Sequence, residues 1–298
     1  MGKNSSIEWT HHTFNPWWGC EKVSQACKFC YAEAWAKRVG EDIWGRRAPR
    51  RFFSEKHWQE PLKWNASAAK DKERRRVFCA SMADVFEKRA DLDAWRTKLW
   101  PVIEETPWLD WLLLTKRPEN IGGMVPWKMN WPSNIWLGTT VENQRYADER
   151  IPHLVSHAAA CRFLSCEPLL GALDLAKWFP IGRIRSRKLA DVYPFAARKD
   201  NFVDWIIAGG ESGSSARPMH PDWARNLRDQ CAKSGVAFHF KQWGHWSPIE
   251  HGNEATRRQL ILESATGKPV VMEPLGKKAA GRLLDGRTWD QFPIRAAA

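Results

Sequence analysis

The chain lacks several features that define common protein classes. It has no apolar run of 18 residues, so no transmembrane helix is predicted. Its first residues, Met-Gly-Lys-Asn-Ser-Ser, form no apolar signal segment, and we expect no export by that route. Seven cysteines, an odd number, argue against a disulfide framework. There is no P-loop, two-metal motif or solenoid-type repeat. We therefore expect a cytoplasmic protein with free thiols and no membrane partner.

The composition indicates a folded, basic protein. With 298 residues, of which 43% are hydrophobic, the chain is long enough for one large domain or one domain with an insertion. The net charge is +12, and a field of this sign attracts polyanions. Both a solvated basic surface and a nucleic-acid interface fit this charge. The basic residues cluster in Arg46–Arg51, Lys70–Arg76 and Arg183–Lys188.

Aromatic residues are abundant, with 20 tryptophans and 13 phenylalanines. Most are expected in the core, because aromatic burial dominates interior energetics. Trp17, Trp18, Trp243 and Trp246 lie in segments with glycine or proline, beside candidate site residues. Unstacked bases stack on exposed rings among basic residues, so we expect some of these four at a nucleic-acid interface. For any single tryptophan, a core position remains the better prediction.

Three cysteines near the start of the chain are the clearest indication of function. Cys20, Cys27 and Cys30 lie on a loop-like stretch that follows Asn15-Pro16-Trp17-Trp18-Gly19. A helical pattern over Tyr31–Val39, ended by Gly40, comes directly after them. Thiolates favour iron–sulfur clusters or zinc over harder metals. The loop therefore predicts a metal centre.

Two alternatives to an iron–sulfur cluster remain open at this point. Structural zinc requires four ligands, and His11, His12 or His57 could supply the fourth. The Cys27-x-x-Cys30 pair alone also suits redox-active or simply buried thiols.

The cysteine loop resembles the cluster loop of radical S-adenosylmethionine enzymes, with the aromatic Phe29 directly before the last cysteine. The spacing of six and then two residues departs from the usual three and two of that superfamily. Together with residues 15–19 and Gly-Gly-Glu-Ser-Gly at 209–213, it resembles a phage- and prophage-associated, radical-SAM-like family. The resemblance covers most of the chain. It implies a 4Fe–4S cluster on the three cysteines, S-adenosylmethionine on the open fourth iron, and an electron donor such as flavodoxin or ferredoxin, but no particular substrate.

Short apolar or β-branched runs alternate with helical patterns at the spacing of βα units. This alternation predicts a partial (β/α) barrel, radical-SAM-like, of about six to seven parallel strands over residues 1–245. We expect a basic insertion near 175–201 and a C-terminal extension over 246–298 that packs on the barrel. The predicted strands are Thr10–Phe14, Val77–Ala80, Trp111–Leu114, Ile135–Leu137, Arg162–Leu164, Val203–Ala208 and Val236–Phe240, and the predicted helices include Asp93–Glu105, Asn143–Leu154 and Asp222–Ser234.

Polar residues end each predicted strand, and in such sheets ligands bind at the carboxyl ends of the strands. From the resemblance, Ser81 and Asp84 are better placed than Glu211 for the methionyl amine of the cofactor. The Gly209-Gly210 backbone would approach the adenine closely, although a tight turn is an equal alternative. The residues predicted to bind the cofactor are Ser81, Asp84, Thr139, Thr140, Glu142, Gly209, Gly210 and Glu211.

Further rim residues are candidates for substrate binding and catalysis. Lys241 shares a strand face with His239 and reaches the substrate if that face is the lumen. Cys166 is a candidate hydrogen-atom donor to a product radical. Structural ion pairs and a buried thiol are the competing interpretations. The residues predicted to bind substrate are Lys116, Arg117, Glu167 and Trp243.

Three functions follow from these patterns. The first is a radical S-adenosylmethionine enzyme that modifies or repairs a nucleic acid or nucleotide. The second is a non-catalytic nucleic-acid-binding protein whose cysteine loop is stabilised by zinc or a cluster. The third is a phosphoester or nucleotide enzyme on a plain barrel, for which the rim offers acidic residues but no recognisable motif.

Overall fold

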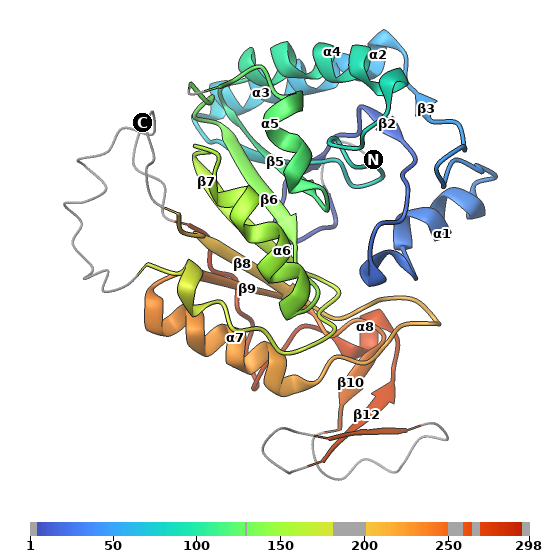
Figure 1. The fold of residues 1–298 in the computed structure, drawn as a ribbon, viewed down its shortest axis with the longest axis vertical. Helices are drawn as coiled ribbons and strands as arrows, with labels where there is room; N and C mark the ends of the chain where they lie inside the picture. The colour runs from blue at the N-terminus through green and yellow to red at the C-terminus, as the bar shows by residue number, and fades with distance from the viewer. Residues whose placement is uncertain (1–4, 129, 181–200, 250–258, 264–268, 294–298) are drawn as a thin grey trace.

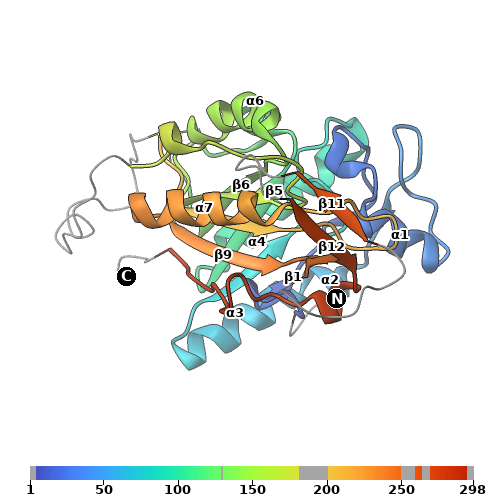
Figure 2. The same ribbon diagram turned by 90° about the horizontal axis from the view of Figure 1, so that it is seen from below.

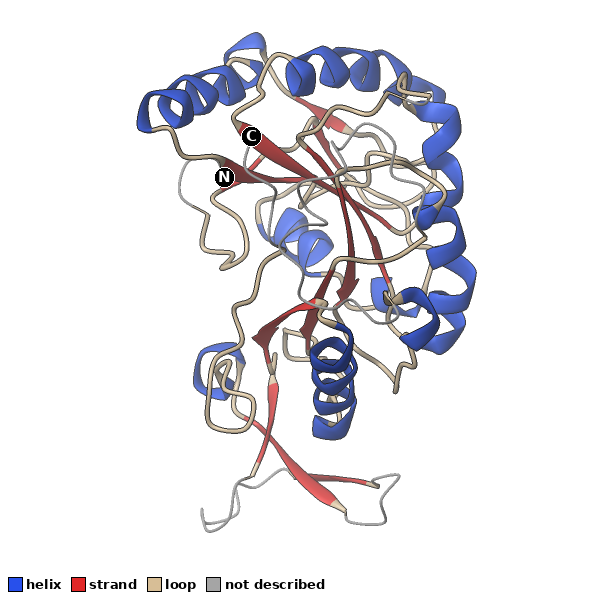
Figure 3. Cartoon of the chain, turned by 90° about the vertical axis from the view of Figure 1, so that its left-hand side faces the viewer, coloured by secondary structure: helices blue, strands red, loops and turns tan. Residues whose placement is uncertain are grey.

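The computed structural model describes residues 5–128, 130–180, 201–249, 259–263 and 269–293. Seven parallel strands form one curved sheet with helices along its outer face (Figure 1, Figure 3). The predicted partial (β/α) barrel is thereby confirmed. In pairing order, the strands are β1 (His12–Thr13), β4 (Arg75–Cys79), β5 (Leu109–Thr115), β6 (Ile135–Thr140), β7 (Cys161–Cys166), β8 (Trp205–Gly209) and β9 (Ala237–Gln242).

Helices and short 3-10 turns connect the strands. Helix ends follow local chemistry: the Asn143 side chain accepts a hydrogen bond from the N–H of Tyr146 at the start of α6, and Gly235 ends α7 in the left-handed region. The helices and turns between the strands are α3 (Glu60–Asp71), η2 (Ala90–Leu92), α4 (Asp93–Glu104), η3 (Pro118–Asn120), α5 (Ile121–Met124), α6 (Gln144–Val155), η4 (Ala176–Trp178) and α7 (Pro221–Ser234).

The two faces of the sheet pack differently. The outer face carries mainly aliphatic residues against the helices, whereas the lumen is filled with aromatic rings, among them Phe78, Trp136, Phe163 and Trp205. Gly138 makes room for this packing, because a Cβ there would lie 2.4 Å from the Phe163 ring. Both faces are buried, as expected for a parallel sheet. The aromatic filling closes the amino-terminal half of the barrel.

The connection from β1 to β4 carries the three cysteines at the carboxyl end of the sheet. It extends beyond the barrel as a separate lobe, on the right in Figure 1. Its elements are β2 (Trp17–Trp18), η1 (Gln25–Cys27), α1 (Tyr31–Arg38), β3 (Arg51–Phe52) and α2 (Glu55–Trp58).

The C-terminal part contributes a small sheet and an edge cover. Residues 289–291 run along β9 (Figure 2), where Trp289 O accepts from Phe240 N and Gln291 N donates to Phe238 O. This contact covers the free edge of β9. The predicted basic insertion falls largely outside the described residues. No helix in the described ranges is long and apolar enough to cross a membrane. The remaining elements are β10 (Trp246–Pro248), β11 (Leu260–Leu262), β12 (Val270–Pro274) and α8 (Lys277–Ala280).

Candidate functional site

The three cysteines line a single cavity at the carboxyl ends of the strands. Cys20, Cys27 and Cys30 are partly buried, and none forms a disulfide. The cavity is about 170 Å³ and extends from the loop into the lumen. The Phe29 ring forms part of the cavity wall. In the sequence it lies between Cys27 and Cys30. Three thiols therefore converge on the place where ligands bind in this fold class.

A buried ion pair holds the first cysteine. Arg117, which follows β5, donates to Asp84, which follows β4, at 2.9 Å. The same guanidinium donates to the carbonyl of Glu21 at 2.8 Å and lies 3.8 Å from the Cys20 sulfur. Asp84 also accepts bonds from the Thr115 hydroxyl and the Lys116 N–H. The strand ends thus fix the start of the cysteine loop.

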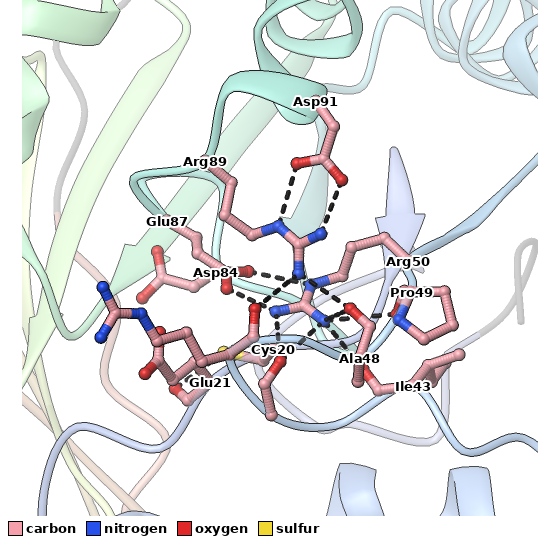
Figure 4. A network of polar contacts seen from close by, with 12 residues as sticks. Cys20, Glu21, Ile43, Ala48, Pro49, Arg50, Asp84, Glu87, Arg89 and Asp91 are labelled. Carbon is pink, nitrogen blue, oxygen red and sulfur yellow. Dashed lines mark hydrogen bonds and ion pairs between the residues drawn. The ribbon is translucent and has the colours of Figure 1, made fainter.

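A second buried ion pair, Arg50–Glu87, also supports the start of the cysteine loop. Arg50 is fully enclosed and forms an ion pair with Glu87. Figure 4 shows the Arg50 guanidinium among the carbonyls of Ile43, Ala48 and Pro49. This segment packs on the cysteine loop, because Gly45 N donates to Cys20 O at 2.9 Å.

Two further pairs hold the middle of the loop from the other side of the barrel. Arg217 binds Glu211 with both carboxylate oxygens and donates to the Gln25 carbonyl at 3.0 Å. Its guanidinium lies 5.3 Å from the centre of the Phe29 ring. Glu142, paired with Arg150, accepts from the N–H of Ala26 at 3.4 Å. Residues that follow β4, β5, β6 and β8 therefore all help to hold the cysteine loop in place.

The thiols differ in their electrostatic surroundings. Burial, together with the charge of Asp84, raises the pKa of Cys20 to about 12, although Arg117 opposes this rise. At Cys27 burial also raises the pKa, but the charge of Lys116 and hydrogen bonds to the sulfur outweigh it, and the net pKa is lowered. A metal deprotonates a bound thiol in either setting.

The donor set fits an iron–sulfur cluster better than zinc. Ligands of one zinc ion converge on a point about 2.3 Å from each sulfur, whereas the thiolates of a cluster each bind a different iron. The proposed fourth zinc ligands point elsewhere: His57 bonds to Asn15 O, and the His12 ring stacks on Trp64.

The structure divides the rim residues predicted from the sequence into two groups. Asp84 lines the cavity and is paired with Arg117, and its contact with the cofactor amine stays a prediction. Lys241 faces the lumen with His239, as the strand alternation predicts, and pairs with Glu167 at 2.9 Å. The predicted residues that line the cavity are Ser81, Asp84, Lys116, Arg117, Thr140, Glu167, Gly210, Glu211 and Lys241, whereas Thr139, Glu142, Cys166, Gly209 and Trp243 do not.

The second group serves the framework. Cys166 is fully buried on the helix-facing side with Cys231 nearby, so its position does not support hydrogen-atom donation into the cavity. Trp243 is buried against Phe240 and donates to the Leu283 carbonyl. Its own carbonyl would lie 1.9 Å from a Cβ at Gly210. Two backbone segments approach each other closely at Gly210. This packing accounts for the glycine without a contact to adenine.

The expectation that some of four tryptophans form a nucleic-acid surface is wrong. Trp17, Trp18, Trp243 and Trp246 are all buried, with exposed fractions of 0%, 8%, 4% and 3%, so none offers a free ring. The arginines at 74–76 lie at the amino end of β4, opposite the cysteine loop. They pair with Asp110, Asp71 and the Phe292 ring. Of the third cluster, Arg183–Lys188, every residue lies outside the described ranges.

Sequence reasoning missed three important residues. Arg217 follows the Gly-Gly-Glu segment by a few positions, and its place after Glu211 was the available signal. Trp9 lines the cavity from the segment before β1, and Trp44 lines it from the lobe. Neither tryptophan carries a sequence signal, because both reach the cavity through long-range packing.

Comparisons with known proteins identify a family and a set of solved structures. The family model described as "Protein of unknown function (DUF5131)" matches residues 4–293. No curated protein matches the chain. A structure of spore photoproduct lyase complexed with dinucleoside spore photoproduct is 12% identical, with a TM-score of 0.45 over 91% of this chain and 70% of that chain. A variant of that lyase with bound AdoMet and dinucleoside spore photoproduct is 11% identical, with a TM-score of 0.42 over 91% and 72%.

Proposed function

The chain belongs to the DUF5131 family, and we propose that it is a radical S-adenosylmethionine-type enzyme that uses a 4Fe–4S cluster and acts on a nucleic acid or nucleotide. One observation carries the proposal: Cys20, Cys27 and Cys30 line one cavity at the carboxyl end of a half-barrel. Three thiols from one loop suit a cluster with one iron left for another ligand. The phage-associated family named from the sequence stays a prediction.

Each part of the cavity has a distinct task in this proposal. When bound, the cluster would supply one electron that splits the sulfonium of S-adenosylmethionine into methionine and a 5′-deoxyadenosyl radical. The electron would come from a donor such as flavodoxin or ferredoxin. Arg117 and Arg217 hold the loop by donating to the carbonyls of Glu21 and Gln25. Lys116 and Ser81 line the mouth and are available to orient the cofactor's charged end.

The charge of the protein supports an anionic substrate. The net charge is +12, and Lys116 and Lys22 lie on the cavity lining beside the cysteine loop. Cations around a concave site raise the local concentration of anions such as phosphates. A nucleotide or a nucleic-acid strand fits this field.

Iron binding tests the proposal directly. After anaerobic reconstitution, Cys27→Ala should lose the bound iron and the brown colour, because one thiolate ligand is removed. Cys231→Ala is the matched control, since this thiol is buried on α7 outside the cavity, and it should keep its iron.

Normal iron content in Cys27→Ala would contradict the proposal. A colourless wild-type protein with one zinc per chain would instead support the non-catalytic, zinc-stabilised alternative. With the cluster loaded and reduced, the wild-type protein should release 5′-deoxyadenosine from S-adenosylmethionine, and absence of this product would exclude the radical activity.

A further inference from the structure

The inner end of the cavity has an apolar floor made of Trp9, Phe78 and Leu114. The Trp9 and Phe78 ring centres lie 4.7 Å apart. Beneath them the lumen is filled by other aromatic rings, such as Trp205, whose centre is 6.3 Å from that of Trp9. The floor is therefore rigid and cannot collapse into the barrel.

Polar side chains from the later strands face this floor. Thr140 and Ser165 are register partners on β6 and β7, so their hydroxyl groups lie side by side on the cavity lining. Two residues beyond Ser165, Glu167 reaches over β8 to the ammonium group of Lys241 at 2.9 Å. One wall of the inner cavity is thus aromatic, and the other offers hydroxyls, a carboxylate and an ammonium.

Two buried polar atoms on this lining have no protein partner among the described residues: the Thr140 hydroxyl and the Trp9 indole N–H. Trp9 is 3% exposed and Thr140 is 1% exposed. Buried groups of this kind are normally paired, because an unpaired one loses the hydrogen bond that it makes to water in the unfolded chain. The indole can only donate, whereas the hydroxyl can donate or accept. The Trp9 N–H lies in the plane of its ring, so a molecule stacked on that ring does not pair with it. A ligand with a hydrogen-bonding edge on an apolar body would satisfy the Thr140 hydroxyl.

We propose that the inner cavity binds a nucleobase, with its face toward the Trp9–Phe78 floor and its edge toward Thr140 and Ser165. A nucleobase combines a stacking face with hydrogen-bonding edges, which are the two features that this lining presents. The proposal rests on the proposed function for its chemistry and names its substrate class. Because the floor lies inside the barrel, a paired base must leave its duplex to reach it. The substrate is therefore single-stranded or extrahelical at the reacting nucleotide.

Oligonucleotide binding by the full-length protein tests this inference. We would compare a short single-stranded oligonucleotide with the same strand carrying a central abasic site, by fluorescence anisotropy at fixed salt. Loss of the inserted base should weaken binding roughly tenfold, the usual scale for one stacked base. Thr140→Val should weaken binding of the intact strand several-fold, about the worth of one hydrogen bond. Trp9→Phe should also weaken it, because the smaller ring offers less stacking surface. Both variants should leave abasic binding unchanged.

Two conservative variants serve as controls. Thr140→Ser keeps the hydroxyl and should retain the wild-type preference for the intact strand. Trp178→Phe makes the same change as Trp9→Phe at η4, outside the cavity lining, and it should change nothing. Equal affinity for intact and abasic strands would overturn the inference.

Two further measurements separate this site from the cofactor site and from the cluster. Saturating S-adenosylhomocysteine should leave the preference for the intact strand in place; if it abolishes the preference, the adenine of the cofactor occupies the floor and the inference is wrong. Cys27→Ala should retain the preference. If the protein binds no cluster, its preference for the intact strand should still be measurable. If it shows no such preference, its iron content should be unchanged.

Discussion

The two ends of the half-barrel both carry arginines paired with carboxylates, but the pairs lie in different surroundings. At the carboxyl end, Arg50–Glu87 and Arg117–Asp84 have side chains that are at most 8% exposed, and their guanidinium groups also bind loop carbonyls. At the amino end, the Arg75 side chain is 20% exposed and its partner Asp71 is 43% exposed. The buried pairs organise a loop, whereas the exposed pair joins only neighbouring side chains.

In this strongly basic protein, the comparison distinguishes arginines that stabilise a loop from arginines that only add charge to the surface. Exposed ion pairs contribute about 0–1 kcal/mol, because water and salt screen them. A buried pair is expensive to break, since removal of one partner leaves the other charge without compensation. Arginine suits this task because its five N–H groups can bind a carboxylate and several carbonyls at once. Arg50 and Arg117 therefore specify a loop conformation and do not add to the surface charge.

The largest effect should come from breaking a loop-holding pair. Asp84→Asn keeps the shape of the side chain but leaves the Arg117 charge buried without its counterion, and we expect a loss of roughly 3–5 kcal/mol in the free energy of unfolding. Iron retention should also fall, because Arg117 positions Cys20 and Glu21. Urea denaturation and iron analysis measure the two effects.

The matched control for Asp84→Asn is Asp71→Asn at the amino end, which removes the same charge from an exposed pair. It should cost less than about 1 kcal/mol and leave the iron content unchanged. Equal losses in the two variants would show that burial does not distinguish the two ends.

A smaller, pH-dependent effect is expected in the lumen. Burial lowers the pKa of His239 to about 4; Asp290 raises it, and Arg282, Lys241 and Arg76 lower it further. The native state therefore favours the neutral ring, so stability is fully present above the unfolded pKa of 6.5 and is lost as the pH falls toward 4. The shift corresponds to roughly 3 kcal/mol at most.

Chemical denaturation between pH 7 and pH 4 measures this contribution. His239→Gln should flatten the pH dependence of the unfolding free energy relative to the wild type, whereas His153→Gln, on the exposed face of α6, should not. An unchanged slope in His239→Gln would assign the acid sensitivity to other groups.

The sequence was sufficient for the fold and for the cysteine loop, but not for the partners of individual charges. Strands such as β5 and β8 are visible because their apolar runs are local and recur at the spacing of βα units. The pairing of Arg50 with Glu87 joins segments that are distant in sequence, and no local pattern distinguishes this buried arginine from its exposed neighbours Arg46 and Arg47. The expectation that some of four tryptophans, Trp17 among them, are exposed was wrong for a similar reason, since glycine and proline nearby indicate a loop but not its burial.

The smallest effect should come from the arginines at the amino end. The double variant Arg74→Ala/Arg75→Ala removes two charges that already pair with Asp110 and Asp71, and loss of the exposed Arg75–Asp71 pair should cost less than about 1 kcal/mol. The slope of log K against log salt for binding of a single-stranded oligonucleotide should also stay the same, because this face lies opposite the cavity. Lys116→Gln, at the cavity mouth, should reduce the magnitude of that slope by about one, since each phosphate contact releases about one counterion. If the double variant reduces the slope and Lys116→Gln does not, the nucleic acid binds at the amino end, and the substrate does not enter through the cysteine-lined mouth.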